Sequence, residues 1–94
     1  MKIGYSCNPG STDLEGPYAY IVEQIREVAT FCDEAGLDSI WFTEHHFNYF
    51  KRANLPNPLM MGADVAARTS NIRIGLASAT IPLWHPIRLA EDAA

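Results

Sequence analysis

Apolar residues recur along the chain with two kinds of spacing. After Pro17 they return at steps of three and four residues, which predicts an amphipathic helix that ends at Gly36. The apolar stripe of this helix consists of Ile21, Ile25, Val28, Cys32 and Ala35. Residues 39–43 and 72–79 are apolar without alternation, a pattern that suits strands covered on both faces.

Turn and capping residues predict the other elements. Residues 2–7 are partly apolar and run into an Asn-Pro-Gly sequence, which indicates a first strand and then a loop. Asn57 and Pro58 form a good helix start, with asparagine as the cap and proline in the first turn. This helix is expected to end near residues 69–71, and its apolar positions are Leu59, Met60, Ala63, Ala66 and Ala67. A His-Pro pair at 85–86 opens a last helix.

The predicted order is therefore β-α-β-α-β-α, which indicates an α/β fold with a parallel sheet and right-handed crossovers. No glycine-rich phosphate fingerprint follows the first strand, so a (β/α)8 TIM barrel is favoured over a dinucleotide-binding doubly wound sheet. A barrel needs about 250 residues. We expect residues 1–94 to be an incomplete domain of about three β/α units from its N-terminal part, inactive alone. A small domain that closes by oligomerising is the alternative.

Composition narrows the classes of partner. Hydrophobic residues make up 48% of the chain and charged residues 19%, which is typical of a globular protein. Eleven acidic residues outnumber seven basic ones, so neither nucleic acid nor an anionic membrane is favoured as a partner. No apolar run approaches the ~20 residues that span a bilayer. Two cysteines make no disulfide framework, and we expect a cytoplasmic protein with free thiols.

Candidate chemistry lies where the second predicted strand ends. Its apolar run passes into Glu44, His45 and His46, and ligand sites of parallel α/β folds lie beyond the carboxyl ends of the strands. Histidine suits proton transfer near neutral pH, and a neighbouring carboxylate can orient an imidazole. A purely structural hydrogen-bonded pair of Glu44 and His45 is the first alternative. A metal site is less favoured, because adjacent histidines diverge on a regular strand.

Three segments, taken in order, resemble one family. They are Glu44-His-His-Phe47 after an apolar strand, Ile74-Gly-Leu-Ala-Ser78, and Pro82-x-x-His-Pro86-x-Arg88-x-x-Glu-Asp92. The combination is similar to the bacterial luciferase-like family of flavin-dependent monooxygenases. The resemblance implies a TIM barrel, reduced flavin mononucleotide (FMN), molecular oxygen and a small organic substrate. It also implies a flavin reductase as a candidate partner and a homodimer in the full-length protein.

The same resemblance assigns roles to single residues. It implies that His45 corresponds to the family's active-site histidine beside the flavin ring, and that Glu44 lies near the ring. A non-prolyl cis peptide on the third strand of the family would here join Ala77 and Ser78. We therefore expect His45 to be catalytic, Glu44, Ala77 and Ser78 to bind the cofactor, and no residue to bind a metal.

Three other functions stay open on the sequence alone. A minority of the family uses a deazaflavin for hydride transfer, and a metal-dependent TIM-barrel hydrolase would share the predicted fold. A non-catalytic truncated subunit that only pairs with a partner is the third alternative. The substrate, the electron donor and the residues that bind the flavin phosphate are not indicated by these 94 residues.

Overall fold

The structure, a computed structural model, describes residues 1–9, 18–47 and 55–94. Its elements are β1 (Gly4–Cys7), α1 (Tyr18–Glu34), β2 (Ser39–Phe42), α2 (Pro58–Ala66), β3 (Arg73–Leu76), the short 3-10 helix η1 (Ile81–Leu83) and α3 (Pro86–Ala93). This order confirms the predicted β-α-β-α-β-α alternation. The third strand is shorter than predicted, because its regular pairing with β2 ends at Leu76.

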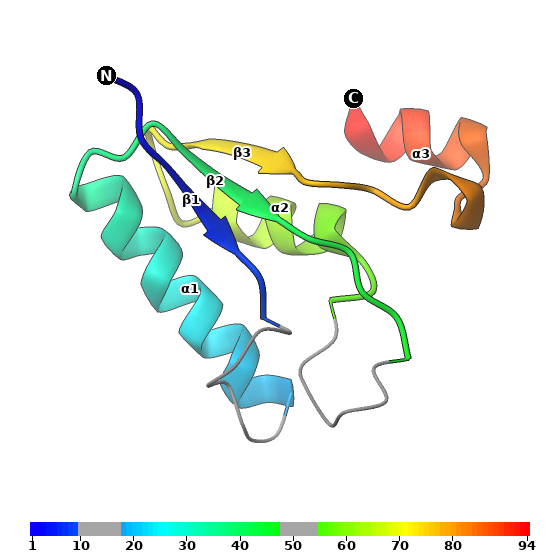
Figure 1. Cartoon of the computed structure of the whole chain (residues 1–94), viewed down its shortest axis with the longest axis horizontal. Coiled ribbons are helices and arrows are strands. Elements are labelled where there is room, and N and C mark those ends of the chain that lie inside the picture. Colours follow the sequence, from blue (N-terminus) through cyan, green and yellow to red (C-terminus); the bar gives the residue numbers. More distant parts are fainter. Residues whose placement is uncertain (10–17, 48–54) are drawn as a thin grey trace.

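The sheet is parallel, with strand order β1-β2-β3. Helices α1 and α2 pack on each other, and both contribute to one core against the sheet, while α3 stands apart beyond β3 (Figure 1). Strands that follow one another in order, joined by right-handed crossovers, place successive helices on the same face of a sheet. A doubly wound sheet reverses its strand order and has helices on both faces. The observed arrangement is therefore that of consecutive units of a barrel.

The core lies between the sheet and the two packed helices. Its buried apolar members are Cys7, Ile21, Ile25, Ala29, Cys32, Ile40, Phe42, Leu55, Met61, Val65 and Ile72. On α1 the predicted stripe is correct except at two positions. Val28 is only half-buried and Ala35 is exposed beyond the helix end, whereas Ala29 is buried. The small side chain of Ala29 allows the helix backbone to lie close to its neighbours.

The predicted apolar face of α2 is wrong by about one residue. Met60 is exposed, and the buried positions are Pro58, Met61, Gly62 and Val65. The contact is made through a glycine, since a Cβ atom added to Gly62 would lie 3.3 Å from Cγ2 of Ile74 on β3. The start of the helix is as predicted, with the Asn57 side chain accepting a hydrogen bond from the Met60 N–H.

Strand β2 is covered by helices on one face only within the described residues. Ile40 and Phe42 are fully buried, but Trp41 points to the opposite face with 43% of its surface exposed. Its indole lies across Gly75 of β3, where a Cβ atom would approach two ring carbons to 2.5 Å. The indole Nε1 donates to Ser39 Oγ at 2.9 Å. The prediction of two covered faces is therefore not met by this part of the chain alone.

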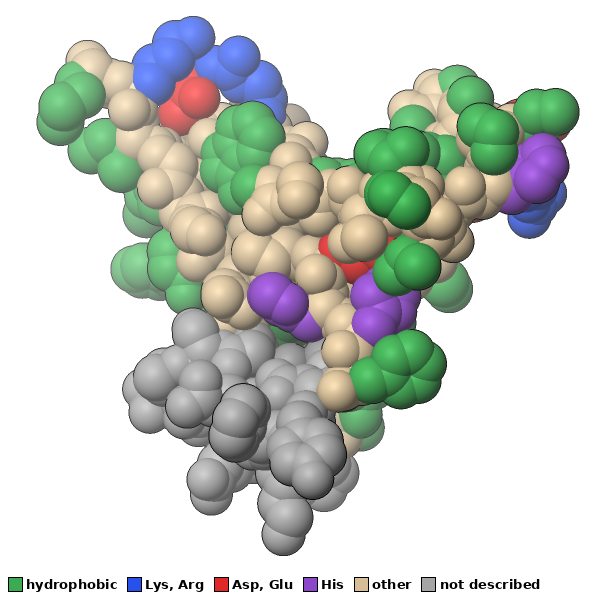
Figure 2. Space-filling model, turned by 45° about the vertical axis from the view of Figure 1, so that its right-hand side comes forward, with side chains coloured by type: hydrophobic (Ala, Val, Ile, Leu, Met, Phe, Trp, Pro, Cys, Tyr) green, Lys and Arg blue, Asp and Glu red, His purple; other side chains and the backbone are tan. Residues whose placement is uncertain are grey.

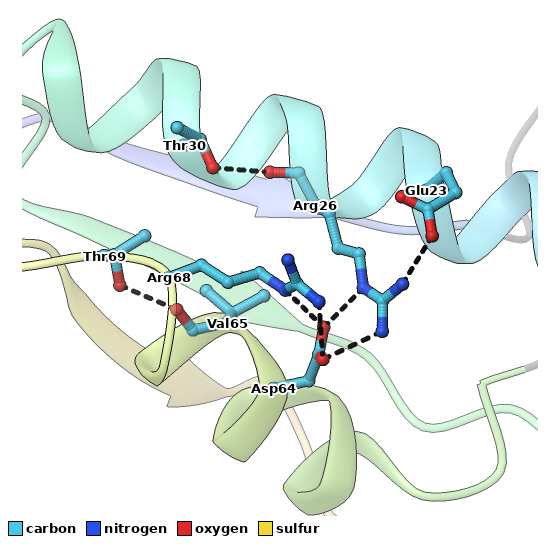
Figure 3. Close-up of polar contacts among 7 residues, drawn as sticks. All are labelled: Glu23, Arg26, Thr30, Asp64, Val65, Arg68 and Thr69. Carbon is cyan, nitrogen blue, oxygen red and sulfur yellow. Dashed lines mark hydrogen bonds and ion pairs between the residues drawn. The ribbon is translucent and has the colours of Figure 1, made fainter.

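An ion-pair network joins α1 to α2 on the outer side (Figure 3). Arg26 donates to both carboxylate oxygens of Asp64, at 2.7 and 2.9 Å, and also to Glu23. Arg68 donates to the same two Asp64 oxygens at 3.3 and 3.4 Å. The hydrogen bonds from Arg26 are the main reason that the pKa of Asp64 is lowered to about 2. The two helices are therefore held together by ion pairs as well as by their apolar contact.

A second carboxylate connects the end of α1 to the start of β3. Asp33 accepts backbone hydrogen bonds from Ser70, Asn71 and Ile72, at 2.8, 2.9 and 2.7 Å. Three consecutive N–H groups favour the charged carboxylate, so the pKa of Asp33 is lowered, with the bond from Ser70 as the largest cause. The turn before β3 is therefore fixed by one side chain.

Two observations bear on the expected cytoplasmic location. Cys7 and Cys32 are both free and buried, and burial raises the pKa of the Cys7 thiol to about 11. No helix within residues 18–34, 58–66 or 86–93 is long and apolar enough to cross a membrane. The location itself stays a prediction.

Candidate functional site

The segments that follow the three strands meet at the carboxyl edge of the sheet. The Ala77 N–H, just after β3, donates to the Phe42 carbonyl at the end of β2, at 2.8 Å. Thr43 Oγ1 contacts Asn8 Oδ1 at 3.3 Å and so links the ends of β2 and β1. This edge is where the sequence predicted a ligand site.

Glu44 is the buried centre of this edge. Its side chain has no exposed surface. Oε2 accepts the Thr80 N–H at 2.6 Å, and both carboxylate oxygens lie 3.0 Å from Trp84 Nε1. Oε1 lies 2.6 Å from His46 Nε2. Because an ionised carboxylate can only accept, that histidine nitrogen carries a proton and donates.

Two opposing effects set the ionisation of Glu44. Burial is the largest single influence on its pKa and acts to raise it, since a carboxylate loses solvation in the interior. The hydrogen bonds from His46, the Thr80 N–H and the Trp84 indole together outweigh burial, and the net pKa of Glu44 is lowered. Glu44 is therefore a carboxylate held in its charged form by three donors.

The two adjacent histidines occupy different environments. Glu44 pairs with His46, whereas the expected alternative paired Glu44 with His45. Glu44 and His46 are two residues apart and contact each other, as alternate residues of an extended segment do. The His45 backbone N–H donates to Leu55 at 3.1 Å, and the His45 residue is exposed. Figure 2 shows histidine side chains beside an acidic one on the face at this edge.

Ala77 and Ser78 follow β3 directly and are both exposed. Their peptide bond is cis, as the resemblance implied. Both side chains are small, so a flat ring can approach the backbone here closely. The exposed groups of this edge, two small residues and an imidazole, fit the approach of a flat ring such as that of a flavin.

Sequence reasoning missed two members of the site. Thr80 and Trp84 lie 36 and 40 residues after Glu44, and no local spacing connects them to it. The pairing of Glu44 with His46 did carry a signal, because alternate residues of an extended chain point the same way. Among the described residues, no group of three or more His, Cys, Asp or Glu side chains is placed to hold a metal ion.

The comparisons with known proteins agree on one family. The family model described as luciferase-like monooxygenase matches residues 1–94. The chain is 38% identical over 74 residues to the oxygenase component of a flavin-dependent trigonelline monooxygenase from Acinetobacter baylyi, covering 79% of this chain and 20% of that protein. It is 31% identical over 72 residues to an alkanal monooxygenase alpha chain from Photorhabdus laumondii, covering 77% and 20%.

Solved structures show the same relationship. A monooxygenase from Streptomyces bottropensis superimposes with a TM-score of 0.89 at 28% identity, covering all of this chain and 28% of that one. The oxygenating constituent of 3,6-diketocamphane monooxygenase from Pseudomonas putida, solved with FMN, gives 0.84 at 26% identity, covering 98% and 24%. The chain thus spans about a fifth of the length of the two relatives and about a quarter of the solved chains. It belongs to the luciferase-like monooxygenase family.

Proposed function

We propose that the full-length protein is a flavin-dependent monooxygenase that uses reduced FMN and molecular oxygen on a small organic substrate. The observation that carries this proposal is the family match over residues 1–94, together with an FMN-bound relative of the same fold. We further propose that these residues form the first three β/α units of its barrel domain. The trigonelline relative is named as an oxygenase component, which supports a separate reductase as the source of reduced flavin. A homodimer is also part of the proposal.

The residues at the carboxyl edge have separate roles in this proposal. Ala77 and Ser78 would lie against the flavin ring, because their small side chains leave room for it. His45 would take up or release a proton near the reacting atoms, since its side chain is exposed at the edge. The bound reduced flavin would supply the activation of oxygen, and the protein would orient the substrate and exclude water.

Substitution of His45 in the full-length protein tests this proposal. His45→Ala should lower turnover with reduced FMN and oxygen by ~10²–10⁴-fold, the usual contribution of a positioned acid or base. FMN affinity, measured by quenching of flavin fluorescence, should change only a few-fold. His85→Ala is a matched control, because His85 is an exposed histidine whose side chain makes no capping hydrogen bond at the start of α3.

Two results would each contradict a part of the proposal. A full-length protein that fails to bind FMN is not a flavin enzyme of this kind. Equal turnover for the wild type and His45→Ala would contradict the proton-handling role of His45. It would not contradict the proposed flavin-dependent monooxygenase activity of the protein.

A further inference from the structure

The carboxylate of Glu44 accepts hydrogen bonds from three donors that come from separate places in the chain. One is the imidazole of His46, two residues away, and the others are the backbone N–H of Thr80 and the indole of Trp84. Among the described residues its nearest basic partner is the His46 ring, and no lysine or arginine is paired with it. A buried carboxylate is costly unless it is satisfied in this way. The three hydrogen bonds therefore compensate for the loss of solvation that the Glu44 carboxylate suffers in its buried position.

The first consequence concerns the span between Ala77 and Thr80. At one end of this span the Ala77 N–H donates to the Phe42 carbonyl at 2.8 Å. At the other end the Thr80 N–H donates to Glu44 Oε2 at 2.6 Å. Both acceptors belong to residues two apart at the end of β2. The exposed Ser78 thus lies on a short span that the β2 segment anchors on both sides.

The second consequence concerns the two histidines. Contact with the carboxylate requires the proton on His46 Nε2, which selects one tautomer of the neutral ring. His46 contacts the carboxylate and has 28% of its side chain exposed, while the neighbouring His45 is an exposed residue. The carboxylate thereby gives the two adjacent histidines different surroundings: His46 is bound to it, and His45 is exposed.

From these contacts we infer that Glu44 is a positioning residue. It fixes the Ala77–Thr80 span against the end of β2 and holds His46 in one tautomer. The indole of Trp84 donates to the carboxylate as its third partner. The expected contact of Glu44 with the cofactor stays a prediction, whereas a side chain with no exposed surface favours the positioning role. The inference rests on the proposed function in one respect: the ring that the Ala77–Thr80 span would face is taken to be that of the flavin.

Three variants of the full-length protein test the inference by kinetics. Glu44→Gln keeps one oxygen acceptor but turns an amide NH2 toward the donors His46 and Trp84, so kcat should fall ~10–100-fold, the range seen when outer partners of catalytic groups are changed. KM for the organic substrate should change by less than about threefold, since the Glu44 side chain has no exposed surface for a substrate to contact. Glu44→Asp retains the charge and should recover part of the lost kcat.

Trp84→Phe removes one donor from Glu44 and leaves an aromatic ring in place. Its kcat should fall less than that of Glu44→Gln. Trp41→Phe is the matched control, because it also removes an indole hydrogen bond of about the same length, but to Ser39 at the start of β2. Its kcat should match the wild type.

A readout without flavin separates this inference from the proposed function. In the full-length protein with 15N-labelled histidine, His46 should show a protonated Nε2, and Glu44→Gln should shift it toward a mixture of tautomers. The indole proton of Trp84 should move upfield in the same variant, and that of Trp41 should not. If the protein binds no FMN, the proposed function fails and these resonances alone decide the inference.

Two outcomes would overturn the inference. Unchanged His46 and Trp84 resonances in Glu44→Gln would show that the carboxylate does not hold them. Changed resonances with wild-type kcat in both Glu44→Gln and Trp84→Phe would show that the contacts are structural only. If Glu44→Gln does not fold, the kcat of Trp84→Phe, compared with that of Trp41→Phe, decides between the two roles of Glu44.

Discussion

The contact between Trp41 and Gly75 makes a quantitative prediction for Gly75→Ala. A Cβ atom at this position would lie 2.5 Å from Cε3 and Cζ3 of the Trp41 ring, where ordinary contacts are 3.4–4 Å. The ring must therefore retreat by roughly 1 Å, which breaks or weakens the bond from Nε1 to Ser39 Oγ. Overpacking of this kind costs ~1–3 kcal/mol. Alanine restricts the unfolded chain and offsets this by ~0.4–1 kcal/mol, so the net loss should lie between roughly 0 and 2.6 kcal/mol, with a central value of about 1.3 kcal/mol.

The assay is urea unfolding of the full-length protein, followed by far-UV circular dichroism. Gly75→Ala is measured in the wild type and in a Trp41→Ala background. Without the indole the clash is absent, so alanine should be neutral or stabilising by up to ~1 kcal/mol. The coupling energy of the double-mutant cycle should then be roughly 1–3 kcal/mol, the size of the overpacking term.

Gly36→Ala is the control for a glycine effect that does not depend on the indole. Gly36 has a φ of +75° and no atom within 4 Å of an added Cβ. Its substitution should cost ~1–2 kcal/mol through the backbone alone, and equally with or without Trp41. The reasoning is refuted if Gly75→Ala costs the same in both backgrounds, because the ring would then not be the obstacle.

Other substitutions test the core, a helix cap and the ion-pair network. Phe42→Ala should lose ~3–5 kcal/mol in urea unfolding, because Phe42 is fully buried; a loss below about 1 kcal/mol would contradict that burial. Asn57→Ala removes the acceptor of the Met60 N–H and should cost ~0.5–2 kcal/mol, whereas Asn57→Asp should keep most of the stability. The pKa of Asp64 is lowered from 3.8 to about 2. Its stabilising contribution is therefore full above about pH 5 and is lost as the pH falls through about 4 to 2. Asp64→Asn should lack this acid-sensitive part in unfolding midpoints measured from about pH 5 to 2, and an unchanged pH profile would argue against the network.

Local sequence patterns are sufficient to predict the element order and the edge that carries the chemistry. The stripe from Ile21 to Cys32 and the cap at Asn57 are properties of neighbouring residues, and the structure confirms the cap and all of this stripe except Val28. The phase of α2 is not predictable in this way, because Gly62 has no side chain to mark it as apolar. Its burial depends on Ile74, a residue on another element.

The site is predictable in part for the same reason. Glu44 and the histidines are found because an apolar run ends at them. The contact of the carboxylate with His46 agrees with the rule that alternate residues of an extended chain point the same way, and that rule could have been applied to the sequence. The indole of Trp84 arrives from 40 residues away, and only the folded arrangement of β3 and the segment after it reveals that contact.

The carboxylate of Asp33 also determines which residues of β3 can face which way. It receives three consecutive N–H groups that end one residue before the strand. A slip of β3 by a single position would exchange the two faces of the strand. Gly75 would leave the indole of Trp41, and Ile74 would leave the gap at Gly62 that admits it. A side chain at the end of the first helix thus selects one alignment of the third strand out of the neighbouring ones.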